Sequence, residues 1–301
     1  MKLLRKTLDL FLGQPAIWLT YLGARWLVAC LGWVRKSASD RIIEWCPTGH
    51  SVLGGAAFQN CGENWELKLT LTRLVRSGFE FADRCIYTVM LVAIALIVGA
   101  ILRGETPALK TIASAPRPSL GRILVYSIKI WFLGLILSVL IYEPSYTEAV
   151  SKHFSAQWVS YAFTAGQSVL STVCYVWIMV PLAIALLRPA GAGVVPVEEK
   201  RLGRLFLILT GLAAYATESL LAPVMTTILA SVSKPVQPLA VGMLSPVFSF
   251  PNLIGDIALV LLASQLDWRA IEVKAAPSIE WLQRLFRGLM PLHYLPKKKE
   301  I

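Results

Sequence analysis

The chain alternates between long apolar runs and shorter polar connections. A helix needs about 20 mostly apolar residues to cross a bilayer, and five runs satisfy this well, while a sixth is interrupted by Arg25. The six predicted spans are Ala16–Val34, Ile86–Leu102, Ile123–Tyr142, Trp158–Leu187, Leu205–Ala230 and Leu239–Leu266. This pattern predicts an all-α, polytopic integral membrane protein with about six transmembrane helices.

Both ends of the chain carry amphipathic patterns. Near the N-terminus, Leu4, Leu8, Phe11 and Leu12 fall on one side of a helix. Near the C-terminus, apolar residues recur at helical spacing from Ile279 to Met290, with polar and charged residues on the opposite face. Basic amphipathic helices of this kind lie in the membrane interface. The sequence predicts such helices at both ends, with the alternative that the last one packs on the protein's own cytoplasmic face. The basic residues expected to contact the membrane surface are Arg284, Arg287, Lys297, Lys298 and Lys299.

One sizeable hydrophilic region, residues 35–85, separates the first two spans. Its first half is rich in glycine, proline and asparagine, which favour loops and turns. Leu67, Leu69 and Leu71 then alternate with polar residues as in a strand, although Leu67, Leu71, Leu74 and Val75 also fit one face of a helix. We expect a surface-lying amphipathic helix that leads into the next span. The predicted organisation is 1–34 (basic start and first span), 35–85 (extramembrane), 86–266 (five-span core) and 267–301 (interfacial helix and basic tail).

Composition strengthens the membrane interpretation. Hydrophobic residues make up 56% of the 301 residues and charged ones only 16%, whereas soluble domains carry about 25% charged residues. These values exclude disorder and a disulfide-dense mini-protein. The net charge of +11 indicates contact with anionic lipid headgroups, and no motif indicates a nucleic-acid partner.

The distribution of basic residues predicts the orientation. With six spans and a cytoplasmic N-terminus, 18 of the 29 Lys and Arg residues fall in cytoplasmic segments and nine in outer ones. With five spans this bias nearly disappears, so the positive-inside rule favours six spans with both termini cytoplasmic. A bacterial cytoplasmic membrane is favoured. The final residues, from Lys298 to Ile301, resemble a dilysine retrieval signal, which leaves the endoplasmic reticulum as the alternative.

Cysteine spacing indicates neither zinc nor a redox motif. Cys46 and Cys61 share the hydrophilic segment, so a disulfide between them is an open possibility if that segment faces an oxidising compartment. The three histidines are not spaced for metal ligation, and no cofactor is expected.

Charged groups within predicted spans are the candidate functional residues. Glu218 and Asp256 lie near the middle of the fifth and sixth spans, and Arg25 lies centrally in the first. Each costs about 2.5–3.5 kcal/mol on insertion scales. Together they could form a site that binds a cation or relays a proton, or alternatively a structural ion pair. Lys129 lies near the inner end of its span and can extend its amine to the headgroups.

The sixth predicted span contains helix-breaking residues close to its acid. Pro246 and Pro251 precede Asn252, which is four residues before Asp256 and shares its face if the helix resumes there. A broken helix beside an acid is typical of a transport site, although proline kinks also occur for packing reasons.

No catalytic motif stands out in the chain. Three function classes follow, and the first is favoured: a non-catalytic accessory, assembly or trafficking component that organises protein partners or lipids. The second is a small ion- or proton-coupled transporter that uses Glu218 and Asp256. The third, less favoured, is a membrane enzyme that acts on lipid.

Overall fold

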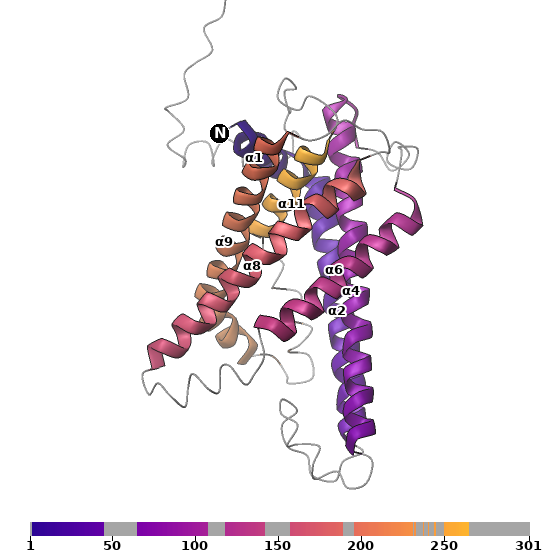
Figure 1. Ribbon diagram of the computed structural model, residues 1–301, viewed down its shortest axis with the longest axis vertical. Helices are drawn as coiled ribbons and strands as arrows, with labels where there is room; N and C mark the ends of the chain where they lie inside the picture. Colours follow the sequence, from indigo (N-terminus) through magenta and orange to yellow (C-terminus); the bar gives the residue numbers. More distant parts are fainter. Residues whose placement is uncertain are drawn as a thin grey trace, which may run out of the picture.

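The computed structural model describes residues 2–44, 65–107, 118–141, 157–188, 196–230 and 250–264, together with the single positions 232, 237, 240 and 244. In these ranges every regular element is an α-helix and no strand occurs, which confirms the all-α prediction. The helices, labelled in Figure 1, are α1 (Lys2–Gly13), α2 (Pro15–Glu44), α4 (Trp65–Leu102), α6 (Leu120–Ile141), α8 (Gln157–Leu187), α9 (Val197–Ala230) and α11 (Phe250–Ala263).

Four of the described helices are long and apolar enough to cross a membrane. The qualifying stretches lie in α2, α4, α6 and α8, and they are Pro15–Ser39, Thr70–Leu102, Leu120–Leu137 and Ala165–Leu187. The remaining two predicted spans fall on α9 and, in part, on α11, which is a shorter apolar helix of 14 residues. The fold is therefore that of an all-helical protein with four candidate membrane-spanning helices among the described residues.

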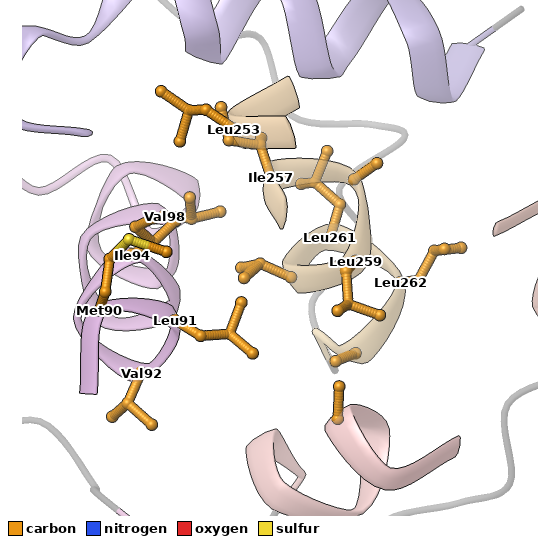
Figure 2. Close-up of a cluster of buried hydrophobic side chains, with 14 of the residues drawn as sticks. Met90, Leu91, Val92, Ile94, Val98, Leu253, Ile257, Leu259, Leu261 and Leu262 are labelled. Atoms are coloured by element: carbon orange, nitrogen blue, oxygen red, sulfur yellow. The ribbon is translucent and has the colours of Figure 1, made fainter. Parts of the chain in front are cut away.

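Helix α11 forms the centre of the bundle. It contacts α1, α4, α8 and α9, and every residue from Gly255 to Ala263 is buried. Figure 2 shows Leu253, Ile257 and Leu261 of α11 close to side chains of α4, including Leu91 and Val98, in the main hydrophobic cluster. A helix that is apolar on nearly all sides needs a cover of protein or lipid, and from Gly255 to Ala263 the neighbouring helices provide this cover for α11.

Helices α2 and α4 form a long pair, visible side by side in Figure 1. At 1.5 Å per residue, the 30 residues of α2 extend about 45 Å and the 38 residues of α4 about 57 Å. Both lengths exceed the hydrocarbon thickness of about 30 Å. The strand alternative for the run from Leu67 to Val75 is wrong, because this run belongs to α4. The helix expected to lead into the next span is continuous with it, since α4 runs without a break from Trp65 to Leu102.

Helix α1 packs into the protein's own core. Leu3 and Leu10 are buried in the same hydrophobic cluster as α11, whereas Leu4 is exposed. The helix itself was predicted, but its buried face is centred on Leu3, Thr7 and Leu10 instead of on Leu4. The reason is that α11 covers this face of α1, so the apolar residues bury against protein.

Several helix ends meet at one end of the bundle. At the start of α6, Arg122 donates from its Nη2 to the backbone carbonyl oxygens of Ala185, Leu186 and Arg188 at the end of α8. Arg188 in turn donates to the carbonyl oxygen of Ala263 at the end of α11, at 3.2 Å. These side chains provide donors to carbonyls that have no partner within their own helix. The described ends of the segments 103–122 and 188–204 thus lie together.

Candidate intramembrane polar site

Asp256 is the central residue of a polar cluster inside the bundle. It lies in α11, whose first turn contains Pro251, a position where proline's missing N–H has no helical partner to lose. The side chain is only 6% exposed. Its Oδ1 accepts a hydrogen bond from the hydroxyl of Tyr87 in α4, at an O–O distance of 2.6 Å. A buried polar group needs such a partner, because leaving it unpaired costs about 1–3 kcal/mol.

Three tyrosines from three helices interact electrostatically with this carboxyl group. Besides Tyr87, these are Tyr126 of α6 and Tyr175 of α8. The hydroxyl of Tyr126 also lies 3.2 Å from the sulfur of Met179. These interactions therefore connect α4, α6, α8 and α11.

Charged side chains complete the cluster. Arg25 of α2 interacts electrostatically with Asp256, while Asp83 and Arg84 of α4 interact with Tyr175. The guanidinium of Arg84 extends toward α6, where its Nη2 lies 3.7 Å from the position that a Cβ on Gly134 would occupy. The formal charges of the two arginines and the two aspartates cancel, so the cluster carries no net formal charge.

A chain of hydroxyl groups links α4 to α6 beside the cluster. Ser127 of α6 lies 2.9 Å, oxygen to oxygen, from the hydroxyl of Thr88, and both side chains are fully buried. Thr88 in turn donates to the backbone carbonyl of Arg84 at 2.7 Å. Both hydroxyls have partners, so this contact fixes the position of α4 against α6 directly beside Arg84 and Tyr87.

The predicted site residues divide into three groups. Arg25 and Asp256 are brought within electrostatic range of each other. Asn252 is half-buried in α11, one turn before Asp256. Glu218 belongs to α9, but its side chain lies outside the described residues, as does Pro246. The same applies to Cys46 and Cys61 and to the surface-contact residues Arg284, Arg287, Lys297, Lys298 and Lys299.

Sequence reasoning missed five members of the cluster: Asp83, Arg84, Tyr87, Tyr126 and Tyr175. The tyrosines gave a usable signal, since each lies within or at the edge of an apolar run of a different helix. A tyrosine in an apolar environment needs a partner for its hydroxyl. Three such residues together with one acid are consistent with a shared polar site.

A groove opens beside this cluster, between the first half of α6 and the last half of α8. Its volume is about 370 Å³, and Tyr126 contributes to its wall. Because Tyr126 also interacts with Asp256, this tyrosine connects the groove to the buried cluster.

Comparison with protein-family models, curated proteins and solved structures gave no match. Among the described residues, no group of three or more His, Cys, Asp or Glu side chains could hold a metal ion. The cluster's own chemistry consists of two carboxyl groups, three phenolic hydroxyls and two guanidinium groups. Such an arrangement can fix helices relative to one another, or its carboxyl groups can take up and release protons.

Proposed function

We propose that this protein is an accessory or assembly component of a membrane, which binds a transmembrane helix of a partner protein along one side of α2. The observation that supports this is an exposed stripe on α2, here called the α2 stripe. Its members are Leu19, Gly23, Trp26, Cys30 and Trp33, spaced alternately four and three residues apart. Leu19 is 69% exposed, Trp26 44% and Trp33 46%.

The spacing of the α2 stripe fits a helical partner. A 4-3 alternation repeats every seven residues, which is the period of helices that pack along each other at a shallow angle. Gly23 has no atom within 4 Å of the position of a Cβ, and small residues allow two membrane helices to approach closely. Of the four candidate spans, α2 is the least covered, with 11% of its apolar stretch buried against 56% for α4.

The membrane topology is part of the same proposal. We propose six spans, with α9 and the α11 region as the fifth and sixth, and with both ends of this chain on the cytoplasmic side of a bacterial membrane. The meeting of Arg122 and Arg188 at one end of the bundle supports a common side for these basic ends. Anionic headgroups and protein partners within the membrane are the expected contacts.

Two glycine variants test the partner surface. Gly23 and Gly32 both lie in α2, about half a turn apart around the helix axis, and neither has an atom within 4 Å of its Cβ position. Both positions therefore accommodate a Cβ, and unchanged thermal unfolding of Gly23→Leu and Gly32→Leu verifies that the bundle stays intact in each variant. We expect Gly23→Leu to weaken partner binding about tenfold, because a bulky side chain in a packed seam costs about 1–3 kcal/mol. Gly32→Leu should leave binding unchanged.

Cys30 supplies the probe for this test, since it is exposed in the middle of the α2 stripe. In a variant with Cys30 as its only cysteine, a thiol cross-linker applied to native membranes should give a discrete adduct with one protein. The yield should fall with Gly23→Leu and not with Gly32→Leu. Equal yields in the two variants, or an adduct made only of two copies of this chain, would contradict the proposed role.

An ion- or proton-coupled carrier is the second candidate. The contact that favours it is Tyr126, which lines the groove and interacts with Asp256. Phenolic hydroxyls between a groove and a buried acid could relay a proton.

Proton flux separates the two candidates. For the accessory component, we expect vesicles containing wild-type protein to lose an imposed pH gradient no faster than protein-free vesicles. A carrier would instead accelerate the loss, and Asp256→Asn would abolish that acceleration because the amide cannot take up the proton. A pH-sensitive dye inside the vesicles measures both rates.

A further inference from the structure

The groove between α6 and α8 combines basic and apolar walls. From α6 it is lined by Arg122, Val125 and Lys129, which follow one another at helical spacing on a single face, and from α8 by Leu182 and Leu186. Val125 is 50% exposed, and Lys129 is exposed as well. The groove is therefore accessible from the outside of the bundle, on a surface that belongs to two candidate membrane spans.

Both charged residues of the groove are basic, and no carboxylate is among its lining residues. Lys129 has no hydrogen-bond acceptor within the described ranges. Arg122 uses its Nη2 for the carbonyls at the end of α8, which leaves Nε and Nη1 without an acceptor among the same residues. Donors for an anion thus remain on both side chains.

The position of Lys129 makes an anionic ligand favourable. A charged lysine within a span is costly, and an opposite charge offsets part of this cost. Arg122 and Lys129 are seven residues apart, so their Cα atoms are separated by about 10 Å along the axis of α6. The flexible lysine chain can extend toward the end of the helix, which brings its ammonium group toward Arg122.

We propose that this groove binds the phosphate of an anionic glycerophospholipid between Arg122 and Lys129, with an acyl chain along Val125, Leu182 and Leu186. Basic pockets between membrane helices are typical sites for anionic headgroups. The apolar wall beside the basic pair distinguishes a lipid from a soluble anion, because only the lipid has a chain to place there. This site lies on α6 and α8 and not on the α2 stripe, so the lipid proposal does not depend on the proposed partner binding.

Native mass spectrometry of the full chain tests the site. The protein is purified in micelles that contain phosphatidylglycerol and phosphatidylcholine, and the ratio of the two bound lipids is measured. We expect the wild type to retain phosphatidylglycerol preferentially. Lys129→Gln should reduce this preference about tenfold, which corresponds to about 1.4 kcal/mol, while Lys129→Arg should keep it because the charge remains.

Lys36→Gln is the matched control. Lys36 is an exposed lysine in the last third of α2, toward its C-terminal end. The same substitution there should leave the lipid ratio unchanged. Equal retention by the wild type and Lys129→Gln would overturn the proposal, and so would an equal loss in Lys36→Gln, which would indicate nonspecific attraction. Displacement of phosphatidylglycerol by inorganic phosphate would also overturn it, since the groove would then select a soluble anion.

Discussion

Replacing Asp256 with alanine should lower the free energy of unfolding by about 3 kcal/mol, the upper end of the usual cost of leaving a buried hydrogen-bonding group without its partner. The variant deprives the hydroxyl of Tyr87 of its acceptor at 2.6 Å and leaves an excess positive charge near Arg25. Asp256 is only 6% exposed, so water cannot readily replace the lost contacts. Denaturant unfolding of the micelle-bound protein, followed by tryptophan fluorescence, measures the change.

Three further variants provide a scale for the loss of unfolding free energy in Asp256→Ala. Tyr87→Phe and Asp256→Asn should each cost less, because each keeps most of the packing. Glu105→Ala removes an ion pair with Arg103, whose side chains are 43% and 39% exposed, and should cost at most about 1 kcal/mol. If Asp256→Ala were no more harmful than Glu105→Ala, the polar cluster would not contribute to stability.

Enlarging Gly255 should separate α9 from α11 and lower the free energy of unfolding. A Cβ at this position would lie 2.6 Å from Oγ1 of Thr210 and 3.0 Å from Cδ2 of Leu207. Thr210 has little freedom to move aside, because its hydroxyl donates to the carbonyl of Leu207 at 3.1 Å. Overpacking of this kind costs about 1–3 kcal/mol, so Gly255→Ala should lower stability by that amount and Gly255→Leu by more.

Gly78→Ala is the control for this prediction. Gly78 lies inside α4, and its Cβ position has no atom within 4 Å. Alanine there should leave stability unchanged or raise it by about 0.4–1 kcal/mol, since it restricts the unfolded chain without creating a clash. Equal thermal midpoints for Gly255→Ala and Gly78→Ala would show that α9 can shift away from α11 at no cost.

The lengths of the apolar runs predicted that the fold is helical. They predicted α4 too short, and the high charge density of its first part is the reason. The run from Trp65 to Cys85 has a charged residue on nearly every turn. These charges lower its average hydropathy, so the sequence alone predicts an extramembrane segment there. Leu, Lys, Arg and Glu are nevertheless good helix formers, and Arg76 pairs with Glu80 one turn later at 2.8 Å. Helix α4 therefore extends about six turns before its apolar part begins.

The polar cluster could be predicted only in part. Arg25 and Asp256 were singled out because a charge within an apolar run is conspicuous. Asp83 and Arg84 were missed because they precede the predicted span by two or three residues, in a region assigned to the outside. The tyrosines were missed because such residues often anchor spans at the interface. Only the packing of α4 against α11 shows that Tyr87 instead points at Asp256.

The position of α11 also affects the order in which the chain can fold. Helix α1, made first, packs against α11, made last of the described helices, and Leu3 and Leu10 share a cluster with Leu253. Contacts between such distant parts of a chain form late. Until the ribosome has made α11, these early apolar side chains lack their final cover and depend on lipid or insertion factors. A ribosome stalled before residue 250 should therefore hold a chain whose α1 remains accessible to protease.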